Sequence, residues 1–268
     1  MSTALTMRVG CIGVGHMASA ILSTILETRT IEPSRLTIFD PLPAQMTAYA
    51  RQGVCIAGSP AEVVASSELI LLAVKPQIMG EVLTQLGNPA GKCFISIAAG
   101  ITTDFLRAGL PGAHVIRVMP NATLTVGCGA TAIAEAPDVP SLYREAARTI
   151  FSCGGIVEEM SEDKLVSVVA VNGSSPAYFY QIVSQLASYG ASQGIDPAAA
   201  LRLAAKTMEG AARVLLQGEK SPAELVRMVA TPGGTTQAAM DAMLDNGLEE
   251  AVTAGLEACT RRTAELSR

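Results

Sequence analysis

Residues 1–160 alternate short apolar runs with amphipathic segments, and this alternation constrains the fold more than any other feature. Several runs are apolar at nearly every position, which is typical of strands covered by helices on both faces. The pattern predicts an α/β domain built on a doubly wound, mostly parallel sheet. We expect strands at Arg8–Gly13, Leu36–Asp40, Leu69–Val74, Cys93–Ser96, His114–Val118, Ala130–Ala134 and Ile156–Glu158. We expect helices at Met17–Glu27, Pro43–Gln52, Pro76–Leu86 and Pro140–Phe151.

The pattern changes near Ser161 and is helical almost throughout from there on. Asp196-Pro197 and Ser221-Pro222 each place a capping residue before a proline at the first helical position. Gly247 separates the last two expected helices. We therefore expect two domains, an α/β domain of residues 1–160 and an all-α domain of residues 161–268.

The composition excludes several classes of protein. Hydrophobic residues make up 49% of the 268 residues, enough for a sizeable core, and the net charge of −5 comes without a basic stripe for nucleic acid. No segment approaches the about 18 apolar residues of a membrane span, and no signal peptide is evident, so we expect a cytoplasmic protein. The six cysteines form no Cys-x-x-Cys pair and only two histidines accompany them, so we expect no metal site.

A glycine-rich turn follows the first expected strand and precedes a helix. It has the pattern Gly-x-Gly-x-x-Ala from Gly13 to Ala18. Gly13 permits a tight turn, Gly15 lets a pyrophosphate approach the backbone, and Ala18 lets the helix pack closely on the strand. We therefore predict a dinucleotide site that includes Gly13, Val14, Gly15, His16, Met17 and Ala18.

Asp40 stands at the end of the second expected strand, where a carboxylate can accept hydrogen bonds from the hydroxyls of the adenosine ribose. The same negative charge repels a 2′-phosphate, which favours NADH over NADPH. Arg35 and Arg51 are the nearest residues that could compensate for this charge.

Three later strand ends carry further candidates, because ligands of open α/β sheets lie beyond the carboxyl ends of strands. Lys75, in the segment Ala73, Val74, Lys75 and Pro76, is a candidate for contact with ribose or nicotinamide, although a lone surface lysine is the alternative. The small residues Ala98, Ala99 and Gly100 would let a nicotinamide ring come close. Asn121, shortly after Met119, could hydrogen-bond a carboxamide or a substrate.

Two segments of the helical half place small polar residues ahead of an expected helix. They are Asn172–Tyr178, which includes Ser174 and Ser175, and Thr231–Thr236. Free backbone N–H groups at a helix start attract anions, so a carboxylate substrate would fit either segment. Simple helix capping is the alternative for each segment taken alone.

These motifs, in this order, resemble the pyrroline-5-carboxylate reductase family, and the resemblance covers nearly the whole chain. The segments that carry it are Gly13-x-Gly15-x-Met17, Ala73-Val74-Lys75-Pro76-Gln77, Ser96-Ile97-Ala98-Ala99-Gly100, Arg117-x-Met119-Pro120-Asn121, Gly173-Ser174-Ser175-Pro176-Ala177-Tyr178 and Pro232-Gly233-Gly234-Thr235-Thr236.

The resemblance implies a Rossmann domain followed by a helical domain that interlocks with a second subunit, in a homodimer or a ring of dimers. It implies hydride transfer from NADPH or NADH to the C=N carbon of 1-pyrroline-5-carboxylate, which gives L-proline in the last step of its biosynthesis. The resemblance matches Thr236 to the family's threonine that hydrogen-bonds the ring nitrogen. We expect catalytic roles for Thr236 and, from its place at the strand end, for Lys75. The substrate residues that the resemblance implies are Met119, Asn121, Ser174, Ser175, Thr231, Pro232, Gly233, Gly234, Thr235 and Thr236.

The chain also departs from the family's pattern. Asp40-Pro41 stands where the family often has Ser or Asn followed by Arg, which weakens the case for NADPH. Val166 and Val169 align with a frequent Asp and Thr, and Pro60 aligns with a frequent Asn. These differences leave open a related cyclic imine, such as a six-membered ring homologue.

Two other functions share parts of this pattern. A 3-hydroxyacid dehydrogenase has the same architecture but needs a catalytic lysine early in its helical half, where Lys164 stands without the Gly-Gly-x-x-Lys spacing. A nucleotide-sensing protein without turnover would have no need of an anion site and Thr236.

Overall fold

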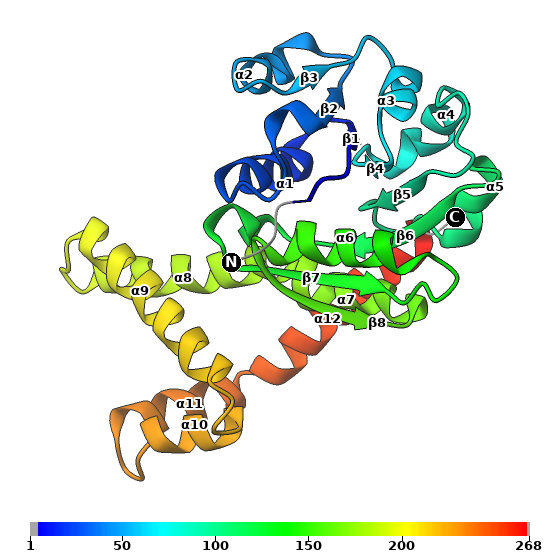
Figure 1. The fold of residues 1–268 in the computed structure, drawn as a ribbon. Coiled ribbons are helices and arrows are strands. Elements are labelled where there is room, and N and C mark those ends of the chain that lie inside the picture. The colour runs from blue at the N-terminus through cyan, green and yellow to red at the C-terminus, as the bar shows by residue number, and fades with distance from the viewer. Residues whose placement is uncertain (1–4, 267–268) are drawn as a thin grey trace. The chain divides into compact units, whose positions relative to one another are not determined.

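The structure is a computed structural model that describes residues 5–266, and its main feature is a single mixed sheet (Figure 1). In this part of the chain the sheet has eight strands in the order β3-β2-β1-β4-β5-β6-β7-β8. Neighbouring strands are parallel except β6 and β7, so the predicted doubly wound, mostly parallel sheet is confirmed. The strands are β1 (Val9–Ile12), β2 (Leu36–Phe39), β3 (Cys55–Ile56), β4 (Leu69–Leu72), β5 (Cys93–Ser96), β6 (His114–Met119), β7 (Gly129–Ala134) and β8 (Gly155–Met160).

The helices follow the strands in the first half of the chain and succeed one another in the second half (Figure 1). The α-helices are α1 (His16–Glu27), α2 (Thr47–Ala50), α3 (Pro60–Ser66), α4 (Met79–Thr84), α5 (Thr103–Gly109), α6 (Ser141–Ser152), α7 (Leu165–Val168), α8 (Ser175–Ser192), α9 (Pro197–Leu216), α10 (Pro222–Val229), α11 (Thr235–Asp245) and α12 (Leu248–Leu266). Short 3₁₀ turns lie at Pro33–Arg35, Pro43–Gln45, Pro76–Ile78, Ala122–Val126 and Glu162–Lys164, and a π-helix at Val169–Gly173.

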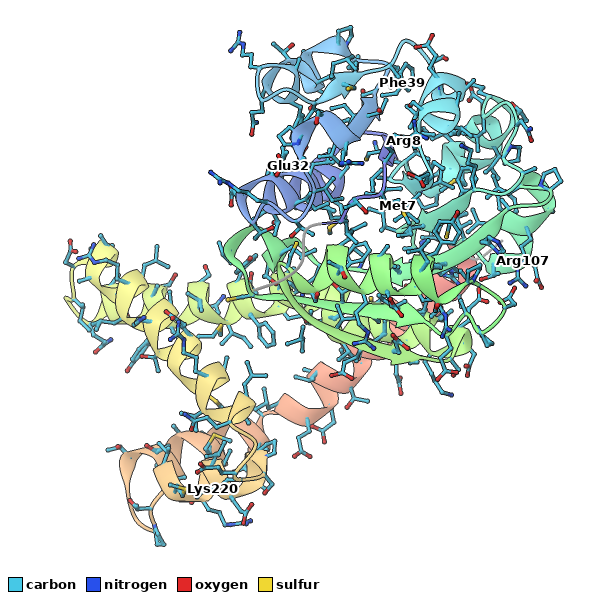
Figure 2. All side chains as sticks on the ribbon, in the orientation of Figure 1. Met7, Arg8, Glu32, Phe39, Arg107 and Lys220 are labelled. Atoms are coloured by element: carbon cyan, nitrogen blue, oxygen red, sulfur yellow. The ribbon has the colours of Figure 1, made fainter. Side chains whose placement is uncertain are left out.

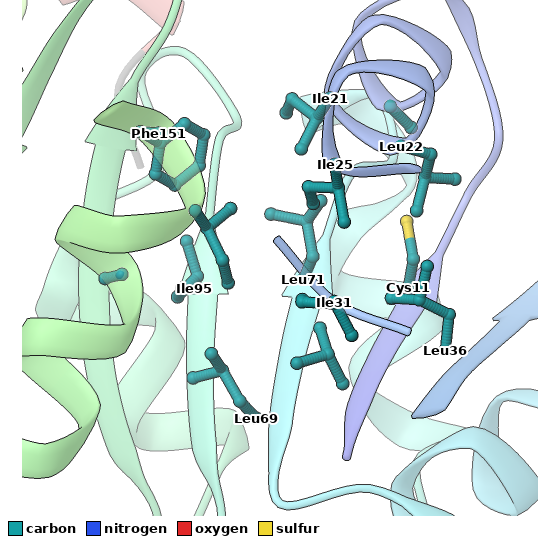
Figure 3. Packing of buried hydrophobic residues seen from close by; sticks show 14 of the residues in the cluster. Cys11, Ile21, Leu22, Ile25, Ile31, Leu36, Leu69, Leu71, Ile95 and Phe151 are labelled. Atoms are coloured by element: carbon teal, nitrogen blue, oxygen red, sulfur yellow. The ribbon is translucent and has the colours of Figure 1, made fainter. Parts of the chain in front are cut away.

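One face of the sheet is covered by α1 and α6. Figure 3 shows Ile21 and Ile25 of α1 above β1 and β4, and Phe151 of α6 near Ile95 of β5. These side chains belong to one buried apolar cluster, which also contains Leu71. Burying this many branched apolar side chains is the main stabilising contribution to the first half of the chain.

The opposite face of the sheet is covered by α3, α4 and α5. A second buried cluster joins Phe94 and Leu72 of the sheet to Val63 of α3, Val82 of α4 and Leu106 of α5. Because both faces are covered, the central strands are apolar at successive positions rather than at alternate ones, as the sequence indicates.

The helix α3 lies so close to β1 that only glycine fits at one position of that strand. A Cβ atom on Gly10 would lie 2.5 Å from Cγ1 of Val63 and 2.7 Å from Oγ of Ser67. These distances are far shorter than van der Waals contact, so the absence of a side chain sets the spacing of helix and sheet here.

Several predicted elements differ in detail from the observed ones. Strand β3 was not expected, because two exposed residues are too few to produce a periodic pattern. The expected helices Pro43–Gln52 and Pro76–Leu86 each divide into a 3₁₀ turn that begins at the proline and a short α-helix. The helices α3 and α5 also lie between strands where no helix was specified.

Contacts divide the chain into two compact units, one containing the chain up to Ser174 and again from Cys259, the other containing Ser175–Ala258. The boundary predicted from sequence lies earlier, between residues 160 and 161. Within the second unit, Asp196 caps α9 through the N–H of Ala199, and Ser221 forms a capping box at the start of α10, as the sequence suggested.

We expect Gly10→Ala to lower the free energy of unfolding by about 1–3 kcal/mol, because the added methyl group overpacks the contact with α3. Gly80→Ala in α4 is the matched control, since its Cβ would meet Cζ of Phe105 at an ordinary 3.7 Å. Denaturant unfolding of the two variants checks this prediction. Equal stability of the two variants would contradict it.

Candidate active site

The candidate site begins at the carboxyl edge of the sheet, where the strand order changes direction around β1. Beyond the strands, Gly13 donates an N–H bond to the carbonyl of Phe39 at 2.8 Å, and Ala73 donates one to the carbonyl of Ile12 at 2.9 Å. These bonds hold the segments that leave β2, β1 and β4 side by side. This is the point at which open α/β sheets bind their ligands.

Gly13 occupies a backbone conformation and a space that exclude other residues. Its φ is +91°, in the left-handed region, and a Cβ atom would lie 2.9 Å from the carbonyl oxygen of Ala73. The turn therefore packs directly against the backbone that leaves β4. The predicted tight turn is present, and its positive φ and its close contact with Ala73 explain why residue 13 is glycine.

Gly15 differs from Gly13, because the space around it is open. Among the described residues, no atom lies within 4 Å of the position that its Cβ would take, and its φ of −76° is allowed for any residue. Gly15 is the N-cap of α1, and in the described chain no side chain caps this helix end and its first turn has no acidic residue. The free N–H groups and the open space fit a bound pyrophosphate. His16 is exposed at the helix start and Ala18 is buried, as the packing role requires.

The carboxylate of Asp40 is held by the backbone on both sides. Its Oδ2 accepts a hydrogen bond from the N–H of Val14 at 2.8 Å, and its Oδ1 accepts one from the N–H of Leu42 at 2.9 Å. Burial and, to a lesser degree, the charge of Asp40 raise the pKa of the nearby Cys11 thiol to about 12. Cys11 therefore stays neutral, and Asp40 is the charged group at this edge of the glycine turn.

The next two strand ends present one long polar side chain and several small residues. Lys75 is exposed and precedes the 3₁₀ turn that Pro76 opens. After β5, Ala98 is 6% exposed, and Gly100 has a φ of +76°, so the chain turns sharply with little side-chain bulk. The structure thus places these residues at the same edge of the sheet as the glycine turn.

Asn121 follows β6 at this edge, but its side chain points into the protein. Its Oδ1 accepts bonds from the Thr123 hydroxyl and the Ala130 N–H, and its Nδ2 donates to the carbonyl of Asn172 at 3.2 Å. Asn172 in turn donates to the carbonyl of Met119 at 2.9 Å. Asn121 therefore joins β6, β7 and the π-helix, and its contact with a ligand remains a prediction.

The segment Asn172–Tyr178 begins in the last two residues of the π-helix, Val169–Gly173. Such π-helical turns are rare in proteins, and those that occur often lie at functional sites. Ser174 donates its backbone N–H to the carbonyl of Val169, and its hydroxyl lies 3.4 Å from the thiol of Cys259. Ser175 is buried at the first position of α8. The predicted helix start is therefore present, preceded by an unexpected π-helix.

Thr231–Thr236 belongs to the second unit and forms a tight turn before α11. Gly234 donates an N–H bond to the carbonyl of Thr231 at 2.9 Å, and Gly233 has a φ of +74° after Pro232. This is the arrangement of a turn with proline at its second position and glycine at its third. In the described chain, no side chain caps α11 at Gly234 and its first turn has no acidic residue, so its first N–H groups can take an anion. Thr236 is half-buried in this first turn.

A buried ion pair near the end of β6 was not assigned a role from sequence. Arg117 in β6 is 4% exposed, and its Nη1 donates to Oε1 of Glu162 at 2.8 Å. A buried arginine inside the mostly apolar strand β6 signals that a partner exists. The sequence pattern does not indicate which of the many acidic residues is the partner of Arg117.

Lys164 was the other candidate for a catalytic residue. Lys164 is exposed and pairs with Asp163, and its hydrogen bond to Asp163 raises the pKa of its ammonium group, so it stays protonated. Over residues 5–266, no group of three or more His, Cys, Asp or Glu residues could hold a metal ion. None of the helices in the described residues 5–266 is long and apolar enough to cross a bilayer.

The fold and the site together define an oxidoreductase that uses a nicotinamide dinucleotide. Residues 8–100 match the family described as NADP oxidoreductase, coenzyme F420-dependent, and residues 162–266 match the family described as pyrroline-5-carboxylate reductase dimerisation. The pyrroline-5-carboxylate reductase of Synechocystis is 35% identical over 98% of this chain and 100% of that protein. The Escherichia coli enzyme of the same name is 32% identical over 97% and 98% of the two chains. The chain belongs to the pyrroline-5-carboxylate reductase family.

Solved structures agree with this assignment. A pyrroline-5-carboxylate reductase from Coxiella burnetii superimposes with a TM-score of 0.89, at 28% identity over 98% of this chain and all of that one. The fold is also that of a Plasmodium falciparum pyrroline carboxylate reductase with NADP bound, with a TM-score of 0.91 at 24% identity over 99% of this chain and all of that one.

We expect Gly15→Val to weaken dinucleotide binding by about 100-fold, or about 2.8 kcal/mol, because the side chain enters the space that a pyrophosphate needs. The folded stability should change little, since the new atoms meet open space. Quenching of nicotinamide fluorescence and thermal unfolding measure the two effects. Retained affinity would mean that the turn is only structural.

Proposed function

We propose that this chain reduces 1-pyrroline-5-carboxylate to L-proline with hydride from a reduced nicotinamide dinucleotide. The observation that carries the proposal is the similarity to pyrroline-5-carboxylate reductases along the whole length of both chains. The geometry agrees with it, because the chain contains both a dinucleotide turn and, at the start of α11, an uncapped helix end suited to a carboxylate. The chain would thus catalyse the last step of proline biosynthesis.

The residues of the first unit would hold the dinucleotide. The first N–H groups of α1 would bind the pyrophosphate, and Asp40 would face the adenosine ribose. Small residues after β5 leave room for the nicotinamide, and Lys75 would contact it or its ribose. When bound, the reduced nicotinamide supplies the hydride.

The residues of Thr231–Thr236 would hold the substrate. The N–H groups around Gly233 and Gly234 would bind its carboxylate, and the Thr236 hydroxyl would hydrogen-bond the ring nitrogen. A protonated imine is already electrophilic at carbon, so hydride addition needs no strong acid from the protein. Orientation and electrostatic stabilisation are then sufficient.

Of the two nicotinamide cofactors, we propose that the chain prefers NADH to NADPH. The two N–H bonds to Asp40 fix its carboxylate beside the glycine turn, where it would repel a 2′-phosphate. Arg35 cannot compensate, because it precedes β2 and so lies at the amino edge of the sheet, where its guanidinium donates to the carbonyl of Thr6. Arg51 directly follows α2 and is exposed, which leaves it as the remaining candidate.

The chain would act as a homodimer or a ring of dimers formed through its C-terminal helices. The match of residues 162–266 to a dimerisation family supports this assembly. Many large apolar side chains of these helices are exposed in the single chain. Figure 2 shows side chains of all kinds projecting from α9, α10 and α11. The large exposed examples include Tyr180, Tyr189, Leu203, Leu216, Met228 and Val229. A surface of this kind is typical of an interface between subunits.

Steady-state oxidation of NADH and NADPH tests the proposed reaction directly. We expect turnover with 1-pyrroline-5-carboxylate at a higher kcat/KM than with its six-membered ring homologue, and none with 3-hydroxyacids and the oxidised cofactors. A higher kcat/KM for the six-membered ring would make that compound the substrate. Turnover with a hydroxyacid but not with the imine would overturn the proposed reaction.

We expect Thr236→Ala to lower kcat about tenfold with little change in dinucleotide affinity, because one hydrogen bond to the reacting nitrogen is lost. Thr236→Ser is the matched control, since it keeps the hydroxyl group and should retain most of the rate. Stopped-flow measurement of hydride transfer separates the chemical step from binding. An unchanged rate in the alanine variant would exclude this role.

We expect Asp40→Ser to shift the ratio of kcat/KM values towards NADPH by at least about tenfold, because the repelling charge is removed. Asp40→Asn should shift the ratio in the same direction, since the amide oxygen can still accept from Val14 without the charge. Kinetics with both cofactors provide the measurement. A ratio that moves in neither variant would refute the assignment of NADH.

A further inference from the structure

Glu162 contacts two segments that lead into the candidate site and itself begins a third. Its Oε1 accepts a hydrogen bond from Nη1 of Arg117 and one from the backbone N–H of Thr103, both at 2.8 Å. Arg117 lies two residues before the end of β6. Thr103 is the first residue of α5, directly after the loop that carries Ala98–Gly100. Glu162 opens the stretch that continues through the π-helix.

The burial of Arg117 makes this contact strong. The side chain of Arg117 is 5% exposed, whereas that of Glu162 is 36% exposed. A buried guanidinium without a counter-charge is strongly unfavourable, so the chain must keep a carboxylate at this point. The Thr103 N–H is one of the donors that a helix start leaves without an intrahelical partner, and a carboxylate there also suits the helix dipole.

The charge of Glu162 is maintained by the same contacts. Burial raises the pKa of its carboxyl group, but the hydrogen bonds from Arg117 and Thr103 outweigh this, and the net pKa is lowered. The carboxylate is therefore ionised at neutral pH. Both bonds are of the charge-assisted kind, which are shorter and stronger than neutral ones.

We propose that Glu162 is a positioning residue for hydride transfer, which holds the loop after β5 and the end of β6 in register with each other. These segments carry Ala98–Gly100 and Met119, the residues assigned to the nicotinamide and the substrate. The inference rests on the proposed function, because it concerns the reacting end of that site. Hydride transfer is sensitive to such an alignment, since a displacement of about 1 Å can cost on the order of 100-fold in rate.

The adenosine end of the site provides an internal reference. The glycine turn and Asp40 lie after β1 and β2, and the bonds of Glu162 run to β6 and α5 instead. A positioning role therefore predicts a loss at the reacting end alone. A general loss of folded structure would weaken both ends together.

The test compares Glu162→Ala, Glu162→Gln and Glu159→Gln in the full-length protein. Glu159 also accepts from an arginine, Arg148, at 2.6 Å, but this pair is exposed on both sides and serves as the matched control. The readouts are kcat and KM for 1-pyrroline-5-carboxylate and the Kd of ADP-ribose, which probes the adenosine end without hydride transfer. Circular dichroism and thermal unfolding report whether each variant is folded.

We expect Glu162→Ala to lower kcat by on the order of 100-fold, and Glu162→Gln by about tenfold because the amide keeps an acceptor oxygen without the charge. The Kd of ADP-ribose should stay within about twofold in both, and Glu159→Gln should match the wild type. If the alanine variant does not fold, the glutamine variant carries the test.

The inference fails if folded Glu162 variants keep the wild-type kcat, or if ADP-ribose affinity falls as much as kcat does. These outcomes differ from a failure of the proposed function. If the proposed function is wrong, the wild-type protein itself will bind ADP-ribose but will not reduce the imine, and both proposals are then overturned.

Discussion

The contact between Gly13 and the backbone that leaves β4 is the constraint on which the site depends. Because a Cβ at this position would lie 2.9 Å from the Ala73 carbonyl oxygen, the turn can pack there only as glycine with a positive φ. The packed turn determines where α1 begins and leaves its first N–H groups without a side-chain cap in the described chain. It also brings the Val14 N–H within 2.8 Å of Asp40. One steric requirement thus sets the start of α1 and orients the carboxylate of Asp40 beside it.

Much of the fold could be predicted because it is encoded by local pattern. The apolar runs of the central strands and the amphipathic helices α1 and α6 follow directly from burial on both faces of a sheet. The caps at Asp196 and Ser221 were visible because a capping residue and a proline are neighbours in sequence. Strand β3 was not visible, since two residues give no period, and the π-helix has no local signal that distinguishes it from an α-helix.

The segments of the candidate site could be named from the sequence, but the contacts within them could not. The glycine pattern and the strand ends identified the edge of the sheet, because chain order and right-handed crossovers decide which ends meet there. The side-chain orientation of Asn121 and the partner of Arg117 depend on segments 9 and 45 residues away in the chain. Arg35 is close to Asp40 in sequence, yet β2 places it at the opposite edge. Such pairings follow from tertiary packing, which no short window of sequence contains.

The function proposed for these residues depends on one step, in which hydride passes from a reduced nicotinamide to the carbon of a cyclic imine acid. The most direct measurement uses NADH with deuterium at the transferred position and 1-pyrroline-5-carboxylate, followed by mass spectrometry and NMR of the product. We expect L-proline with one deuterium on the former imine carbon, formed in step with NADH oxidation. Proline without deuterium, or NADH oxidation that does not depend on the imine, would contradict it.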